Sequence, residues 1–409
     1  MKYAHLADLH LGSWKEEKMR LLSVQAFTTA IDNCIQEQVD FILFSGDLFN
    51  TSLPSLEILK IVAKKLKQLQ QKGIPLYAIP GSHDFSPSGK TMIDVLENAG
   101  LLINVCKGKI NPETKQLELK FTIDQKTGAK ITGMLGRKGM LDKTYYENLN
   151  LKLLETEPGY KIFLFHTTLS ELKPKHLEMM EGQPASFLPK GFNYYAGGHV
   201  HHPTQQIIEQ YGLCTYPGAI FPNNFSEIEK YSHGGYLLID DELGKIEWIP
   251  IKVINHIPIK IDCTHKIPSV ITFDLLNSVN NLDLTNTLIT IKLTGTLDNG
   301  KISEINFPEI FQRLYQQGAY WVMKNTAQLQ TNQFEEIKID TSSPENIEEE
   351  IIKEHLQQVK VYDKETELQL TKQIFQTLNT EKKEGETIRD FQQRVKEEMN
   401  QILKLELEP

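Results

Sequence analysis

Short apolar runs alternate with longer amphipathic stretches in the first part of the chain. Residues 2–7 alternate in polarity, and residues 41–44 and 74–79 are apolar runs of strand length. Between them, residues 17–37 and 55–72 repeat apolar side chains at three- and four-residue spacing, which predicts two helices. This β-α-β-α-β order with buried strands predicts a layered α/β domain.

Further runs of strand length extend this pattern to about residue 250. They lie at 117–123, 130–136, 161–166, 193–197, 205–209, 235–240 and 246–251. We therefore expect residues 1–250 to form one α/β sandwich. Residues 251–338 change character and predict a small α+β domain. In it we expect strands at 257–262, 269–275 and 287–293 and one helix near 307–318.

The carboxy-terminal part has a different composition. Residues 339–350 contain Ser-Ser-Pro and a run of glutamates, which indicates a linker. Residues 351–409 predict helices only. One apolar stripe recurs there at three- and four-residue spacing, formed by Ile388, Phe391, Val395, Met399 and Ile402. The stripe requires a surface to pack on, and either this chain or a partner protein could supply it.

Charge does not by itself favour a nucleic-acid ligand. The 409 residues carry a net charge of −9. Residues 341–409 hold 16 acidic and 10 basic side chains, a net of −6, so the preceding residues carry only −3. Proteins that bind nucleic acid usually show a basic surface. Any affinity for DNA must therefore come from local lysines, bound metal or a partner.

The sequence favours neither a membrane protein nor a disulfide-rich protein. No apolar run approaches the roughly 18 residues that a membrane span requires. The amino terminus reaches an aspartate at position 8, so no signal peptide is expected and a cytoplasmic location is the default. The four cysteines lie without CxxC spacing, which argues against a thiolate zinc site and a disulfide framework.

The residues with metal chemistry stand in short loops, each directly after a predicted strand. The loops are Asp8-Leu9-His10, Gly46-Asp47, Gly81-Ser82-His83-Asp84, His166 and Gly198-His199-Val200-His201. Because ligands bind at the carboxyl ends of strands in open α/β sheets, all five loops could converge there. Carboxylates and imidazoles together suit manganese, iron or zinc.

Such a set predicts a dinuclear metal site. Side chains at i and i+2 of an extended segment point to the same side, so both ligands of DxH and of HxH can reach one cluster. Two cations ~3.5–4 Å apart can clamp the attacking and leaving oxygens of a phosphoryl displacement. A histidine outside the metal shell could protonate the leaving oxygen, and His83 is the candidate. Asp84 could orient His83 or merely cap the following turn, whereas His5 is expected to be structural.

The series DxH, GDxx, GxHD, a single histidine and GHxH resembles the calcineurin-like metallophosphoesterases. Within that superfamily, several segments resemble the SbcD-like and archaeal Mre-type nucleases of DNA double-strand-break repair. These segments are HLADLHLG, FSGDLFN, PGSHDFSPSG, FHTTLS, GHVHHP and YPGAIF. The motif order matches across about the first 220 residues, whereas the later domains match by position only.

This resemblance implies a two-sheet α/β metallophosphoesterase sandwich, a DNA-capping α+β domain and a helical tail. It implies a manganese-dependent DNA endonuclease and 3′-5′ double-strand exonuclease. It also implies a homodimer packed through helices like 55–72 and 91–99, and a coiled-coil SMC-like ATPase partner bound by the tail. The activity expected from the residue chemistry alone is phosphoester hydrolysis on two metals.

Residue by residue, the resemblance assigns two manganese sites that share a bridging Asp47. Around the first stand Asp8, His10, Asp47 and His201, and around the second Asp47, Ser82, His166 and His199. His83 aligns with the catalytic histidine of the family.

Two positions depart from the family pattern. Ser82 replaces the usual asparagine ligand, so the second site could be weak, could recruit a water or could be filled by another group. Asn50 stands where several relatives have a histidine. Two alternatives remain open. One is a phosphoesterase acting on nucleotides, phosphoproteins or phospholipids. The other is a non-catalytic adaptor that has lost its second metal through Ser82.

Overall fold

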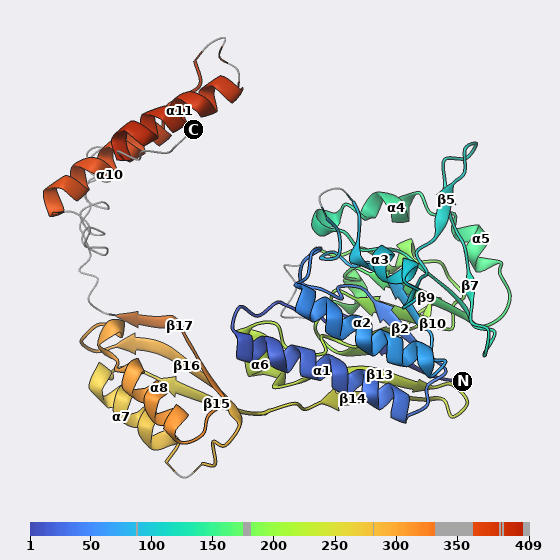
Figure 1. Ribbon diagram of the computed structural model, residues 1–409, viewed down its shortest axis with the longest axis horizontal. Helices are drawn as coiled ribbons and strands as arrows, with labels where there is room; N and C mark the ends of the chain where they lie inside the picture. The colour runs from blue at the N-terminus through green and yellow to red at the C-terminus, as the bar shows by residue number, and fades with distance from the viewer. Residues whose placement is uncertain are drawn as a thin grey trace. The chain divides into compact units, whose positions relative to one another are not determined.

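The computed structural model describes residues 1–86, 89–174, 181–280, 282–331, 363–383, 386 and 388–403 (Figure 1). The chain forms two compact units, Met1–Asn332 and Gln333–Pro409. Among the described helices, none combines the length and the apolar character that crossing a membrane requires.

The first sheet of the larger unit is mixed and has six strands. In spatial order these are β14 (Lys245–Ile251), β13 (Gly234–Asp240), β1 (Lys2–Leu6), β2 (Phe41–Ser45), β3 (Leu76–Ile79) and β4 (Ile103–Asn104). Strands β1 to β4 run parallel to one another, and β13 pairs antiparallel with β1. The carboxyl ends of β1, β2 and β3 therefore meet at one edge of this sheet.

The second sheet also has six strands. Their order is β11 (Thr204–Ile208), β12 (Gly212–Tyr216), β10 (Tyr194–Gly198), β9 (Lys161–His166), β8 (Lys130–Gly133) and β7 (Thr122–Ile123). Strands β12, β10, β9 and β8 are parallel. Residues 117–123 were expected to form one strand. They form two, β6 (Leu117–Leu119) and β7, because β6 turns away to pair with β5 (Gly108–Ile110).

The two sheets pack face to face, which confirms the predicted α/β sandwich. Fully buried aromatic side chains fill the space between them, such as Tyr3 and Phe41 of the first sheet and Tyr194 of the second. The rings of Tyr3 and Phe41 stack with centroids 4.9 Å apart. Burying one large apolar side chain contributes about 1.5–3 kcal/mol. This interface fixes the two strand edges that carry the metal-chemistry loops.

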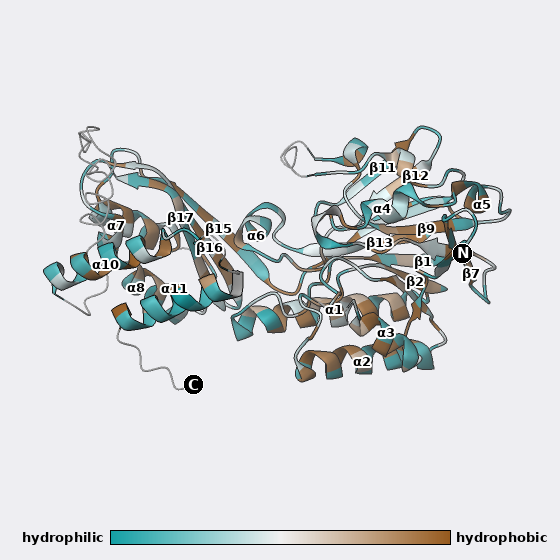
Figure 2. Cartoon of the chain, turned by 90° about the horizontal axis from the view of Figure 1, so that it is seen from above, coloured by the Kyte–Doolittle hydropathy of each residue, from teal (hydrophilic) through white to brown (hydrophobic). Residues whose placement is uncertain are grey.

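Helices cover the outer face of the first sheet (Figure 2). They are α1 (Glu17–Gln36), α2 (Leu56–Gln71) and α3 (Met92–Asn98). The side chain of Ser55 accepts the N–H of Ile58 and caps α2, and Thr91 forms a capping box with Asp94 at α3. Shorter helices follow, namely α4 (Lys143–Glu147), α5 (Leu151–Glu155) and α6 (Phe225–Tyr231).

A second α/β element follows β14 in the same unit. Its order is β15 (Asn255–Asp262), α7 (Pro268–Ser278), β16 (Thr287–Leu297), α8 (Phe307–Gln316) and β17 (Trp321–Thr331). The three strands form one parallel sheet with its own apolar core. The domain boundaries given above remain a prediction.

The strand predicted at 269–275 was wrong, because this segment is helix α7. Pro268 stands at the first helical position, where its missing N–H costs nothing. Ile271, Leu275 and Val279 are spaced by four residues and are buried, whereas Phe273 is 64 % exposed. The β-branched residues of this short segment favoured a strand prediction. Its buried side chains, however, recur with the period of a helix. Strand β17 was not predicted.

The smaller unit contains two described helices, α10 (Lys364–Leu378) and α11 (Ile388–Leu403), which contact each other. Asp363 caps α10 by accepting the N–H groups of Glu365 and Thr366. The side chains of Phe391, Val395, Met399 and Ile402 are half-buried. Contact with α10 thus accounts for part of the predicted apolar stripe. The predicted linker at 339–350 lies outside the described residues.

Candidate metal centre

The loop after β1 adopts an unusual backbone conformation. Asp8 and His10 have φ angles of 53° and 43°, in the left-handed region that non-glycine residues rarely adopt. The N–H of Asp8 donates to the carbonyl of Gly46 at 3.1 Å, and that of His10 to the carbonyl of Asp47 at 3.0 Å. The loop after β1 is thereby held against the loop after β2. Strained backbone of this kind clusters at functional sites.

One carboxylate oxygen lies close to side chains from several loops of the site. Asp47 Oδ2 lies 3.1 Å from His166 Nε2 and 3.5 Å from His10 Nε2. The same oxygen accepts the Ser82 hydroxyl at 3.3 Å, while Oδ1 accepts the N–H of His83 at 2.7 Å. Asp47 is 1 % exposed and also has a positive φ, of 59°. Its carboxylate therefore lies where the strand-end loops converge.

His166, at the end of β9, is held in one ring orientation. Its Nδ1 donates to the carbonyl of Ser45 at 2.7 Å, because a carbonyl can only accept. The other ring nitrogen, Nε2, is thereby directed at Asp47 Oδ2. Gly198 makes this contact possible, since a Cβ there would lie 2.0 Å from the Ser45 oxygen. Gly136 is likewise required, because its Cβ would lie 2.5 Å from the His166 ring, and the sequence motifs did not include it.

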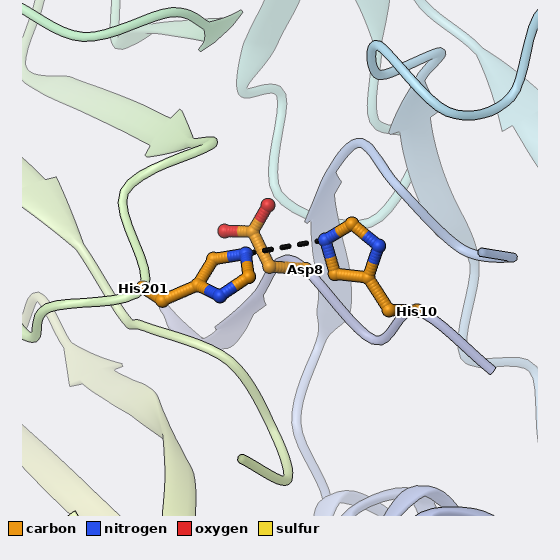
Figure 3. Close-up of side chains that lie close together, drawn as sticks. All are labelled: Asp8, His10 and His201. Atoms are coloured by element: carbon orange, nitrogen blue, oxygen red, sulfur yellow. Dashed lines mark hydrogen bonds between the residues drawn. The ribbon is translucent and has the colours of Figure 1, made fainter. Parts of the chain in front are cut away.

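The loop after β10 connects the second sheet to the first. The N–H of His199 donates to both carboxylate oxygens of Asp8, at 2.9 and 3.0 Å. His201 Nε2 lies 3.1 Å from His10 Nε2, as Figure 3 shows beside Asp8. His201 Nδ1 lies 3.0 Å from the carboxylate of Glu227. Carboxylate partners of this kind orient metal-binding histidines.

Glu227 was missed by sequence reasoning. It lies on α6, three residues after the capping Asn224, and belongs to none of the motifs. Its other oxygen accepts the N–H of Asn223 at 2.8 Å, so the carboxylate itself is held in place. The only sequence signal was an acidic residue in the first turn of a helix, which usually indicates no more than helix stabilisation.

Asp84 neither orients the His83 side chain nor caps the turn that follows it. Its Oδ2 accepts the N–H groups of Asp47 and Gly81, at 3.0 and 2.8 Å. The buried carboxylate therefore joins the loops after β2 and β3. Burial is the main cause that raises the pKa of Asp84 to about 7, and the nearby Asp47 adds to it.

His83 stands at the rim of the cluster and is half-buried. Its Nδ1 donates to the backbone carbonyl of Asn50 at 2.8 Å, which leaves Nε2 available. The ring lies edge-on to that of His10, with centroids 4.8 Å apart. Because the contact uses the backbone of Asn50, the side chain at position 50 does not take part in it.

Two histidines of the site are already in the neutral form that metal binding requires. Burial lowers the pKa of His10 to about 3 and that of His199 to about 4, so both are neutral at pH 7, as metal ligands must be. Burial raises the pKa of Asp8 to about 6. Burial alone would lower the pKa of His166, but the Asp47 carboxylate raises it to about 10, so His166 must lose a proton before it can bind a metal. The same two histidines, His166 and His10, hold the pKa of Asp47 well below its usual range against burial.

These residues fit a metal centre. Three groups bring one ligand atom from each member within 4.8 Å of the others: Asp8 with His10 and His201, His10 with Asp47 and His83, and Asp47 with His166 and His199. Among the described buried polar atoms without a hydrogen-bond partner is His166 Nε2, which faces Asp47 Oδ2. Buried donors and acceptors are rarely left unpaired, so a cation would satisfy this cluster. The donors are imidazole nitrogens and carboxylate oxygens, which suit divalent transition metals.

His5 is structural, as its position in the first strand predicted. It is fully buried, with Nε2 3.0 Å from the Ser45 hydroxyl and Nδ1 3.0 Å from the Tyr194 hydroxyl. Burial lowers its pKa to about 3. This histidine therefore joins the two sheets beneath the metal cluster.

Curated relatives are similar over about three fifths of the chain. The DNA double-strand break repair protein Mre11 of Methanopyrus kandleri is 28 % identical over 269 residues, covering 62 % of this chain and 57 % of the relative. The Mre11 protein of Methanococcus maripaludis is 30 % identical, over 58 % of this chain and 61 % of the relative. The uncharacterized metallophosphoesterase YhaO of Bacillus subtilis is 26 % identical, covering 61 % and 59 %. The match thus spans about three fifths of each relative's length.

Two solved structures match at low similarity. One is a novel archaeal phosphodiesterase, at a TM-score of 0.30 and 12 % identity over 61 % of this chain and 99 % of that one. The other is a dimetal phosphatase from Danio rerio, at a TM-score of 0.36 and 10 % identity over 58 % and 91 %. Both scores are too low to support an argument. The family assignment rests instead on the match of residues 1–203 to the calcineurin-like phosphoesterases. Residues 1–203 of this chain are therefore a domain of the calcineurin-like phosphoesterase family.

Proposed function

We propose that this chain is a two-metal, manganese-dependent nuclease that hydrolyses DNA phosphodiester bonds during double-strand-break repair. The observation that carries the proposal is the convergence of the strand-end ligands on Asp47 Oδ2. The archaeal relatives named for double-strand-break repair support the substrate class. The proposed activities are endonucleolytic and 3′-5′ exonucleolytic cleavage.

The proposed ligand sets divide the cluster at Asp47. Asp8, His10, Asp47 and His201 would hold one ion. Asp47, Ser82, His166 and His199 would hold the other. When bound, two such ions polarise the phosphoryl group and lower the pKa of a bound water.

Each remaining residue has a positioning or proton-transfer role in this proposal. Ser45 and Glu227 keep His166 and His201 with one nitrogen directed into the cluster. His83 presents Nε2 beside it and is the proposed general acid for the leaving oxygen, a role commonly filled by histidine. Asp84 keeps the loops of Asp47 and Gly81 together.

The proposed assembly includes DNA, a second copy of this chain and a coiled-coil SMC-like ATPase. Leu53, Leu56 and Val95 are 78 %, 82 % and 54 % exposed beside or on helices α2 and α3. An apolar surface of this kind suits a homodimer contact through these helices. The helices of the smaller unit are the proposed binding site for the ATPase, in a cytoplasmic setting.

The decisive test is release of acid-soluble nucleotides from linear duplex DNA in manganese, with and without EDTA. Manganese-dependent release supports the proposal. Hydrolysis of free nucleotides or phosphopeptides with intact DNA would instead favour a different phosphoesterase. Mass spectrometry of metal content separates both from a non-catalytic adaptor, which would bind fewer than two ions per chain.

Replacing Ser82 with asparagine should lower the manganese concentration needed for half-maximal cleavage and leave the maximal rate similar. The Ser82 hydroxyl already reaches Asp47 Oδ2, and an amide oxygen extends further and is the stronger neutral ligand. A metal titration of both proteins on the same duplex measures this. Ser82→Ala is the matched control and should raise the metal requirement. An equal or higher requirement in the asparagine variant would show that position 82 is not a weakened ligand.

Deleting residues 333–409 should leave manganese-dependent cleavage intact and abolish binding of the ATPase partner. None of the proposed ligands lies in this unit, and it forms a compact unit of its own. Phe375 and Leu378 of α10 are 57 % and 61 % exposed, so Phe375→Glu is a milder companion variant. Pull-down with the purified ATPase and a parallel nuclease assay measure the two effects. Full binding by the truncated chain would give the tail another role.

A further inference from the structure

A cavity of about 340 Å³ adjoins the metal centre on the side of α6. His201 and Glu227 form one of its walls, and both belong to the cluster described above. The rest of the lining comes from residues 202–203, the segment between β12 and α6, the end of α6, residues 233–234 at the start of β13, and Trp248 of β14. Its volume lies within the range of small-molecule sites, ~300–1,000 Å³. The proposed function uses no part of this cavity beyond its shared wall.

Two aromatic pairs line the cavity. His233 stacks on Trp248 with ring centroids 5.7 Å apart and planes 25° apart. His202 lies against Tyr231 at 5.8 Å and 34°. Trp248 is anchored, since it donates its indole N–H to the carbonyl of Pro217 at 2.9 Å. In the second pair, His202 Nδ1 lies 2.9 Å from the Tyr231 hydroxyl, which fixes the two rings relative to each other. The cavity therefore offers flat rings that are held in place before any ligand arrives.

The charges around the cavity are suited to a polyanion. Lys230 lies 5.0 Å from the centroid of the Tyr231 ring, at the cavity wall. The acidic residues of α6 are paired. Glu227 contacts His201, and Glu229 forms ion pairs with Lys260 at 2.8 Å and Lys292 at 3.0 Å. The Glu229 carboxylate is thus compensated by two lysines, which lowers the repulsion that an approaching phosphate meets from α6.

We propose that this cavity is a nucleobase subsite. It takes one unstacked base of the DNA strand whose phosphodiester lies at the metal centre, so this inference rests on the proposed function. Stacking on aromatic side chains is the usual way in which proteins hold single-stranded nucleic acid without reading its sequence, because every base has a flat face. Continuity with the metal centre through His201 places such a base within the same bound strand.

This subsite predicts a substrate preference. A base can enter the cavity only after leaving its stack, which costs least in single-stranded, mismatched or frayed DNA. We therefore expect faster cleavage where the bases near the cut are unpaired. Because the lining holds rings rather than a specific set of donors and acceptors, the preference should depend little on which base is present.

The test is an abasic scan in manganese with single-stranded oligonucleotides, each carrying one abasic residue at a different distance from the cut. For the wild type, kcat/KM should fall at least about fivefold when the base is missing at one fixed distance. Trp248→Leu removes the ring but keeps an apolar side chain. On DNA with no abasic residue, kcat/KM of this variant should fall by a similar factor. Combining the variant with that abasic substrate should add no further loss. Trp248→Phe should restore most of the activity.

Two controls separate this from damage to the fold or the metal centre. Tyr211→Ala removes a half-buried aromatic residue from the turn between β11 and β12, at the opposite sheet edge, and should match the wild type at every abasic position. Metal content and oligonucleotide affinity in EDTA, measured by fluorescence anisotropy, give readouts besides activity. Affinity should fall in Trp248→Leu while metal content stays the same.

The outcomes are distinct. Normal DNA cleavage by the wild type with no position-dependent loss would overturn the subsite and leave the proposed function standing. The subsite would also be overturned if the abasic residue lowered kcat/KM of Trp248→Leu as much as it lowers that of the wild type. Absence of DNA cleavage by the wild type would overturn the proposed function and the subsite together.

Discussion

Replacing Asp47 with alanine should reduce manganese-dependent DNA cleavage to background and lower the metal content of the whole centre. Asp47 Oδ2 lies within 3.5 Å of side chains from three other loops, so its removal deprives both proposed ions of their shared ligand. Two cations ~3.5–4 Å apart repel one another strongly unless a bridging carboxylate offsets their charge. Mass spectrometry of bound metal and a nuclease assay on linear duplex DNA measure the two effects.

Asp47→Asn is the sharper companion variant. Asp47 has a φ of 59°, and asparagine tolerates this region far better than alanine. Asparagine also keeps an oxygen that can accept the N–H of His83, while the negative charge is lost. It should therefore preserve the free energy of unfolding better than alanine but remain inactive. Robust cleavage by the asparagine variant would contradict the assignment of Asp47 as the bridging ligand.

Replacing His83 with alanine should lower kcat by roughly 10²–10⁴ while metal content and DNA affinity stay near those of the wild type. His83 is anchored through Nδ1 to the carbonyl of Asn50, and its ring lies beside that of His10 at the rim of the cluster. General acid or electrostatic assistance from this position acts on the reacting phosphate and contributes little to ground-state binding.

The geometry also brings His83 close enough to Asp47 and His10 to be a ligand itself. Metal content separates the two roles. A variant that loses an ion in proportion to its activity would assign His83 to the metal shell. Substrates with a better leaving group give a second readout, because they need less protonation of the leaving oxygen. The loss in His83→Ala should shrink on such substrates if His83 acts as the general acid.

Much of the framework follows from local sequence. Each proposed metal-centre residue comes directly after an apolar run of strand length, and parallel strands bring their carboxyl ends to one edge. The sequence alone therefore predicts that the DxH, GD, GxHD and GHxH loops lie in one cluster. The α/β class was predictable for the same reason, since buried strands alternate with helices whose apolar positions repeat every three to four residues.

Other features could not be predicted from the local sequence. Residues 268–278 hold β-branched side chains in a run too short to distinguish strand from helix, and only packing against the neighbouring strands selected helix α7. The orienting contacts of Glu227, Gly136 and the Ser45 carbonyl join segments far apart in the chain. Their roles depend on atomic distances, which no motif spacing encodes.

The sequence by itself determined which chemical groups stand at the strand ends, because side-chain type and strand periodicity are local properties. Tertiary structure alone decided how those groups face one another. The packing of two sheets set Asp47 Oδ2 among the histidines, left His83 at the rim, and opened an aromatic cavity between α6 and β14. Such contacts arise between residues up to about two hundred positions apart, such as Asp8 and His199, so their geometry exists only once the core has formed.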